Sequence, residues 1–138
     1  MSDVLRGSCL CGAVRVELSG DPYRVGICHC LDCRKKTGAI FASWAIYPLA
    51  RVEITGETTA REQRNDYTQH RCAVCGSPIY ELQAGSDEAE VFVGVLDEPS
   101  RLTPTYESWT VRREASLPPL PLARRYERNR VGEGRTEP

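Results

Sequence analysis

Seven cysteines, gathered into three short groups, constrain this chain of 138 residues more than any other feature. The groups are a C-x-C at Cys9 and Cys11, a C-x-C-x-x-C at Cys28, Cys30 and Cys33, and a C-x-x-C at Cys72 and Cys75. An odd number of cysteines does not suit a secreted disulfide scaffold, in which thiols pair. In a reducing compartment, clustered cysteines more often bind metal or perform chemistry. The pattern therefore predicts a cytoplasmic metal protein.

The spacing of the cysteines favours zinc, which prefers four ligands in a tetrahedron with sulfur at about 2.3 Å. On an extended segment, residues i and i+2 point the same way, so both thiols of a C-x-C can reach one ion. In a C-x-x-C, a tight turn brings two thiols together, and Gly76 directly after Cys75 permits the backbone to fold back.

Counting ligands predicts two different zinc sites in each chain. The first and last groups sum to four thiols and would close one structural cage; this four-cysteine cluster comprises Cys9, Cys11, Cys72 and Cys75. The middle group supplies three thiols from one segment; this cysteine trio comprises Cys28, Cys30 and Cys33. Three protein ligands plus an open position is the pattern of catalytic zinc. We therefore expect one structural and one catalytic zinc, with the trio as the catalytic residues.

Two alternatives for the trio stay open at this point. His29 or Asp32 could fill the fourth position and make a second inert cage, although neighbouring residues on a strand point to opposite faces, which argues against His29. Alternatively, Cys30 and Cys33 could act as a redox dithiol, but that interpretation leaves the other five cysteines unexplained.

Basic and aromatic residues follow the trio and suit a working site. Arg34, Lys35 and Lys36 would offset the net charge of about −1 that three thiolates and Zn²⁺ carry. We expect Arg34 and Lys35 to bind the carboxylates of an anionic thiol; a merely solvated basic turn fits the sequence equally well. Trp44 and Phe41 could wall the pocket or belong to the core.

Short β segments separated by turns predict a mainly β fold with few short helical turns. Alternating or β-branched stretches predict strands at residues 13–18, 40–47, 51–55, 79–82 and 91–96. No window of about twelve residues shows a helical apolar stripe, and a single helical turn is expected after Cys33.

The C-terminal part differs, so we expect a zinc-binding domain over residues 1–115 and an extended Pro/Arg-rich tail over residues 116–138. Three prolines between Ser116 and Leu122 exclude a helix or an inner strand, because proline lacks the N–H donor. Residues 124–138 are polar and charged, which predicts a frayed end.

Charge and hydropathy exclude some partners. Eighteen basic and nineteen acidic residues give a net charge of −1, which argues against nonspecific binding to nucleic acid. The most apolar window, residues 39–50, is interrupted by Ser43 and Pro48 and is shorter than the ~20 residues of a membrane helix. The N-terminus does not resemble a signal peptide. We expect a soluble cytoplasmic protein with no membrane partner.

Three motifs together resemble the glutathione-dependent formaldehyde-activating family, which also contains centromere protein V. They are Gly7-Ser-Cys-Leu-Cys-Gly-Ala-Val14, Cys28-His-Cys-Leu-Asp-Cys-Arg-Lys-Lys-Thr-Gly38 and Arg71-Cys-Ala-Val-Cys-Gly-Ser-Pro78. The resemblance implies a small β-tent-like zinc fold. It also implies a structural zinc at the four-cysteine cluster and a more labile catalytic zinc at the trio, in agreement with the ligand count. The namesake activity joins glutathione and formaldehyde to S-hydroxymethylglutathione, a carbon–sulfur lyase-type reaction.

The leading hypothesis is therefore a zinc-dependent carbon–sulfur lyase-like enzyme. A small thiol such as glutathione would occupy the open position, be held as the nucleophilic thiolate, and add to formaldehyde or another small aldehyde. Two rivals are a non-catalytic zinc module for protein or nucleic-acid interaction and a zinc store or thiol sensor. Protection of the trio from alkylation by a small thiol separates the enzyme from the interaction module. The oligomeric state stays open, a homodimer included.

Overall fold

Most of the chain forms two β-sheets of unequal size. The computed structural model describes residues 3–98, 100–122 and 124–131. The smaller sheet contains β1 (Val4–Ser8), β2 (Arg15–Ser19) and β5 (Val52–Thr55), all antiparallel, in the order β1-β2-β5. The larger sheet contains β3 (Arg24–Cys28), β4 (Ala42–Pro48), β6 (Thr58–Glu62), β7 (Tyr67–Cys72), β8 (Pro78–Gln83), β9 (Glu88–Phe92), β10 (Tyr106–Ser108) and β11 (Arg124–Arg125).

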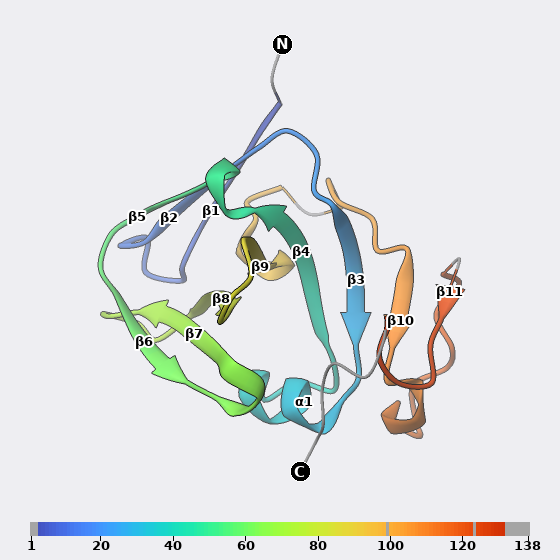
Figure 1. Cartoon of the computed structure of the whole chain (residues 1–138). Helices are drawn as coiled ribbons and strands as arrows, with labels where there is room; N and C mark the ends of the chain where they lie inside the picture. Colours follow the sequence, from blue (N-terminus) through green and yellow to red (C-terminus); the bar gives the residue numbers. More distant parts are fainter. Residues whose placement is uncertain (1–2, 99, 123, 132–138) are drawn as a thin grey trace.

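The eight strands of the larger sheet follow the order β11-β10-β3-β4-β9-β8-β7-β6. Neighbours are antiparallel except that β10 runs parallel to both β3 and β11. Figure 1 shows that this sheet is strongly curved, with β6 and β7 on one side of the molecule and β3 and β10 on the other. The mainly β prediction is confirmed, and four of the predicted strands correspond to β2, β4, β5 and β8. The strand predicted at residues 91–96 is wrong over most of its length, because β9 ends at Phe92 and Val93–Val95 form a 3-10 turn.

Helical structure is confined to short segments. The helix α1 (Leu31–Thr37) follows β3, and four 3-10 turns lie at Leu49–Arg51, Arg64–Asp66, Val93–Val95 and Thr110–Arg112. The sequence predicted a helical turn after Cys33, whereas α1 begins before it. The Cys30 side chain caps the helix by accepting the N–H of Cys33, and Gly38 ends it in the left-handed region, at a φ of 72°.

A single buried cluster of side chains lies between the two sheets and under α1. It includes the apolar residues that alternate along β2, Val16 and Leu18, and a nearly continuous buried run in β4, as expected for an inner strand. The fully buried side chains of Leu18, Tyr47, Ile79 and Val91 anchor it, and the cysteine trio lies within it.

The C-terminal tail differs from the frayed end that the sequence predicted. Residues 116–122 run outside any helix or strand, but Arg124–Arg125 form β11 beside β10. The N–H of Tyr126 then donates to the carbonyl of Glu107 over 2.8 Å. The part of the tail at residues 132–138 lies outside the described residues. Within the described part of the chain, none of the helices combines the length and apolar character of a membrane span.

Candidate metal centres and the adjacent cavity

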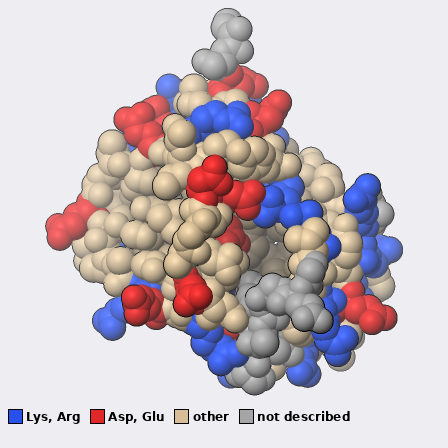
Figure 2. Space-filling model, in the orientation of Figure 1, with Lys and Arg blue, Asp and Glu red and all other residues tan. Residues whose placement is uncertain are grey.

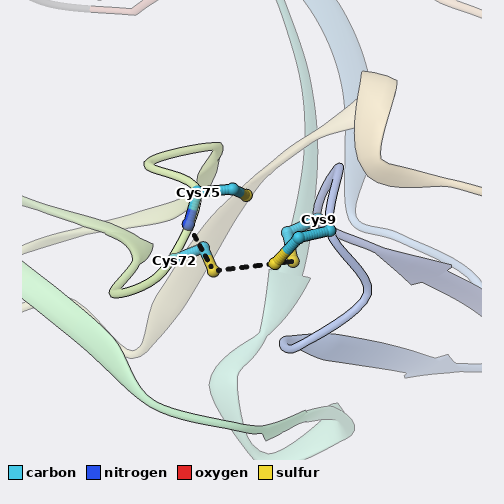
Figure 3. A group of neighbouring side chains, drawn as sticks. Cys9, Cys72 and Cys75 are labelled. Atoms are coloured by element: carbon cyan, nitrogen blue, oxygen red, sulfur yellow. Dashed lines mark hydrogen bonds between the residues drawn. The ribbon is translucent and has the colours of Figure 1, made fainter.

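The structure brings the four-cysteine cluster together from two distant parts of the sequence. Cys9 and Cys11 lie in the turn between β1 and β2, while Cys72 ends β7 and Cys75 lies in the turn before β8. The four sulfurs lie within 4.8 Å of one another. Figure 3 shows the thiols of Cys9, Cys72 and Cys75 directed toward a common space. The C-x-C was expected on an extended segment, but here a turn brings its two thiols together.

Distances within the four-cysteine cluster fit a tetrahedral metal site. The Sγ atoms of Cys9 and Cys11 are 3.6 Å apart, and those of Cys11 and Cys72 are 3.8 Å apart. Four sulfurs at about 2.3 Å from one ion would be about 3.8 Å apart, whereas a disulfide needs about 2.05 Å. All four cysteines are free. The donor set therefore fits zinc.

Hydrogen bonds lower the pKa of two thiols of the four-cysteine cluster, Cys9 and Cys75, whereas burial and the neighbouring thiols raise the pKa of Cys11 to about 11. The N–H of Val14 donates to Cys9 Sγ over 3.2 Å, and the N–H of Val74 donates to Cys72 Sγ over 3.3 Å. The Ser77 hydroxyl lies 3.1 Å from Cys75 Sγ, and this contact and the Ser77 N–H lower the pKa of Cys75 to about 5. Metal-binding sulfur must be deprotonated, so these donors prepare the site for a cation.

The cysteine trio lies at the junction of β3 and α1. Cys28 is the last residue of β3, Cys30 caps α1, and Cys33 lies inside the helix. All three are buried, and their sulfurs lie within 4.8 Å of one another. Side-chain hydrogen bonds with Cys28 and Cys30, together with burial, raise the pKa of Cys33 well above its usual value. A bound divalent cation would remove that penalty, so the trio also fits zinc.

Neither residue considered as a fourth protein ligand joins the trio. Among the described residues, the group of possible ligand atoms at this place contains the three cysteines alone. The fully buried His29 directs Nε2 to Glu107 Oε1 at 2.8 Å. Asp32 lies 3.3 Å from Arg64 Nε and accepts a hydrogen bond from Asn65. These contacts turn both side chains toward other partners.

Glu107 is a partner of His29 that no sequence motif indicated. It lies on β10, 78 residues from His29, and is fully buried. Arg113 donates to its Oε1 over 3.2 Å, and Arg125 Nε lies 3.3 Å from its Oε2. Burial opposes ionisation, but the hydrogen bonds from His29 and Arg113 outweigh it and lower the pKa of Glu107. The carboxylate therefore fixes the orientation of His29, which lies between Cys28 and Cys30 in the sequence.

A cavity of about 180 Å³ opens beside Cys28 on the inner face of the larger sheet. Its lining residues come from β3, β4, β7, β8, β9, β10 and the C-terminal segment: Arg24, Gly26, Ile27, Cys28, Trp44, Ile46, Tyr67, Gln83, Glu90, Tyr106, Ser108, Asn129, Arg130 and Val131. Figure 2 shows a hollow on this face with both basic and acidic side chains near its border. Trp44 is thus both a core residue and a wall of the cavity, whereas Phe41 packs against the His29 ring at 5.7 Å.

The basic residues of the trio motif lie elsewhere. Arg34 pairs with Glu114 at 2.5 Å, and Lys35 is exposed; neither is among the described residues that line this cavity. Lys36 pairs with the buried Glu81 at 2.6 Å. The cationic groups of the cavity are instead Arg24, which begins β3 and lies outside the cysteine motifs, and Arg130, which lies in the C-terminal segment.

Comparisons with known proteins agree with this arrangement. A family model described as "Glutathione-dependent formaldehyde-activating enzyme" matches residues 4–112. The crystal structure of a protein from Rhodobacter sphaeroides is similar, with a TM-score of 0.56 and 24% sequence identity over 69% of this chain and 92% of that chain. This likeness supports the fold alone. No protein of curated function matches the chain in sequence.

Proposed function

Because the chain belongs to the glutathione-dependent formaldehyde-activating enzyme family, we propose that it is a carbon–sulfur lyase-like enzyme acting on adducts of glutathione, or a similar thiol, with formaldehyde or another small aldehyde. The observation that carries the proposal is a buried trio of thiols that lacks a fourth protein ligand among the described residues and lies beside a cavity. Such a site has both a place for a metal and a place for a ligand.

In this proposal Cys28, Cys30 and Cys33 hold the catalytic zinc, and Cys28 faces the substrate. When bound, zinc would supply a soft Lewis acid that favours the thiolate form of a thiol ligand. Trp44 shields one wall of the cavity from water. The hydrogen bond between Glu107 and His29 fixes the backbone of the trio.

The remaining cysteines serve stability in this proposal. The four-cysteine cluster would hold a structural zinc, so that each chain carries two zinc ions. Seven cysteines that form no disulfide suit a reducing compartment, and we propose the cytoplasm as the location.

The proposal is tested by mixing glutathione and formaldehyde and measuring the rate of adduct formation above the uncatalysed background by NMR exchange spectroscopy. The wild-type protein, purified without chelator, should accelerate the exchange. Cys28→Ser should abolish the acceleration while the circular dichroism spectrum persists. Matched iodoacetamide labelling should show that glutathione protects the wild-type trio. A wild-type protein that neither accelerates exchange nor gains protection would instead favour a non-catalytic zinc-binding module.

A further inference from the structure

The C-terminal segment of residues 124–131 lies beyond the family match, which ends at residue 112, yet it forms one wall of the cavity beside Cys28. Asn129, Arg130 and Val131 line this wall. Backbone and side-chain hydrogen bonds hold the segment in place. The N–H of Trp109 donates to the carbonyl of Arg128 over 3.0 Å, and Trp109 Nε1 donates to Asn129 Oδ1 over 3.0 Å. The position of Arg130 is therefore set by the fold.

Arg130 keeps its charge available to a ligand, in contrast to Arg24. Arg24 makes two hydrogen bonds to Glu88, of 3.0 and 2.9 Å, through Nη1 and Nη2, so its charge is paired although its buried Nε has no hydrogen-bond partner among the described residues. Arg130 lies over the Tyr106 ring, 6.0 Å from its centroid, and no acidic side chain in the described part of the chain forms an ion pair with it. Its charge still acts at a distance, since it adds to the effect of Arg24 in lowering the pKa of Glu88.

A second cavity, of about 470 Å³, lies on the other side of Arg130 and extends the basic surroundings. Its described lining residues are Tyr23, Arg24, Thr105, Tyr106, Arg124, Tyr126 and Arg130, and no carboxylate is among them. Arg24, Tyr106 and Arg130 belong to both cavities and form the partition between them. A ligand that reaches from Cys28 to this partition meets the guanidinium group of Arg130.

We infer that the C-terminal segment completes the substrate site and that Arg130 binds a carboxylate of the thiol substrate. The inference rests on the proposed function for the presence of a thiol at the trio. A contact with Arg130 would favour binding of a thiol that carries a carboxylate over binding of a thiol that does not. Glu90 also lines the cavity, so the lining carries both signs of charge. A thiol with an amino-acid end, bearing both an ammonium and a carboxylate group, suits both charges.

The test compares Arg130→Gln and Arg130→Lys with Arg128→Gln, using glutathione and its dimethyl ester. Arg128 belongs to the same segment, is exposed, and lines neither cavity, so Arg128→Gln is the matched control. Circular dichroism and zinc content verify that each variant is folded and loaded. Adduct exchange kinetics give KM and kcat, and calorimetry without formaldehyde gives the Kd of each thiol.

Arg130→Gln should raise the KM and Kd of glutathione roughly tenfold, because one charge-assisted interaction is lost, with kcat nearly unchanged. Arg130→Lys should restore part of the affinity because it keeps the charge. The ester should bind the wild-type protein and Arg130→Gln equally, and Arg128→Gln should resemble the wild-type protein with both thiols.

The two proposals fail in different ways. If the wild-type protein turns over glutathione but Arg130→Gln leaves KM and Kd unchanged, the inference is wrong and the proposed function stands. If no turnover occurs but Arg130→Gln still weakens glutathione binding selectively, the inference stands and the proposed function is wrong. A wild-type protein that binds neither thiol, or binds the ester as well as the acid, also overturns the inference.

Discussion

The buried carboxylate of Glu107 contacts nitrogen atoms of side chains from three separate segments of the chain. His29 comes from the junction of β3 and α1, Arg113 follows the last 3-10 turn, and Arg125 belongs to β11. A buried charge of this kind is costly to leave half-paired. The contact therefore links the trio to the C-terminal segment through one residue.

Glu107→Ala should lower the free energy of unfolding by about 3 kcal/mol, because it leaves buried polar groups of His29 and Arg113 without a partner. Urea unfolding of the zinc-loaded protein measures this change. Glu127→Ala is the control, since Glu127 is exposed in the same region, and it should change stability by no more than about 0.5 kcal/mol. Equal effects of the two substitutions would contradict the role of Glu107.

The Arg24–Glu88 pair predicts a pH-dependent contribution to stability. The hydrogen bond from Arg24 lowers the pKa of Glu88 below its ordinary value of 4.5. A carboxyl whose pKa is lower in the folded state stabilises the fold above its ordinary pKa, and this stabilisation is lost as pH falls through the folded pKa. Glu88→Gln should therefore cost up to about 1 kcal/mol at pH 7, since the pair is partly exposed.

Below pH 4.5 the difference in stability between Glu88→Gln and the wild-type protein should shrink toward zero. Parallel urea titrations of both proteins at pH 7 and pH 4 measure this difference. A difference that grows as the pH falls would contradict the assigned direction of the pKa shift.

Single residues show which parts of the site a sequence can predict. The seven thiols were recognisable because ligand spacing is local, and the structure groups them four and three as the count predicted. The contact of Glu107 with His29 and the place of Arg130 in the cavity wall were not recognisable, because they bring together segments that are distant in sequence. The side chain of Arg34 pairs with Glu114 across 80 residues, a contact that no local pattern indicates, and its expected role in binding substrate stays a prediction.

Among the elements, β3 and β10 depend on a glycine at their contact. Gly26 pairs with Tyr106 across the parallel strands, and the Tyr106 ring lies over the Gly26 backbone, where a Cβ atom would overlap it. This close approach lets the ring stand at the partition between the two cavities.

Gly26→Ala should therefore cost about 1–3 kcal/mol of stability through overpacking and should displace the Tyr106 ring. Tyr106→Ala should recover part of that loss when combined with Gly26→Ala, because the two changes share one contact. Thermal melts of both single variants and the double variant measure the coupling. Strictly additive losses would show that the ring does not rest on the glycine.

The four-cysteine cluster and the trio differ in how far apart in the sequence their cysteines lie. The four-cysteine cluster connects the β1–β2 turn of the smaller sheet to the β7–β8 turn of the larger one, whereas the trio lies within one continuous segment. A metal at the four-cysteine cluster would hold the sheets together, and a metal at the trio would not.

Cys72→Ser should therefore lower the melting temperature much more than Cys30→Ser, because structural zinc contributes directly to folding free energy. Cys30→Ser should lose about one zinc per chain while the melt remains cooperative. Thermal melts with elemental analysis measure both quantities. Equal losses of stability would contradict the division into a structural and a catalytic site.

Strands were predicted where their own sequence shows the alternation or the residue types of a strand. Strand β2 alternates and β4 is rich in β-branched and aromatic residues, so both were found. Strand β3 was missed although it carries Cys28, since its sequence Arg-Val-Gly-Ile-Cys contains a glycine and is buried at almost every position. Strand β11 was missed because two arginines pair only where β10 offers an edge.

At the scale of the whole molecule, the two proposed zinc sites should differ in lability. Mild chelation should remove about one zinc per chain before global unfolding, because the trio can open without separating the sheets. Glutathione should slow this removal by entering the open position. A zinc-sensitive dye and circular dichroism, recorded during a chelator titration, follow the metal and the fold separately.

Two outcomes would contradict this expectation. Both metals could leave together with the fold, or glutathione could change nothing while His29→Ala loosens the metal. Either result would mean that the trio is a closed cage.

The C-terminal segment also covers a strand edge, that of β10, which could otherwise pair with another chain. Without residues 124–131, β10 would present an unpaired backbone edge, and an exposed strand edge is a template for pairing with another chain. Strand β11 covers that edge with only two residues, both arginines, so the new edge is short and charged. The opposite edge strand, β6, likewise carries Arg61 and Glu62 on exposed positions. We therefore expect a chain shortened to its family-matched region to self-associate more readily than the full chain, because the β10 edge would be exposed.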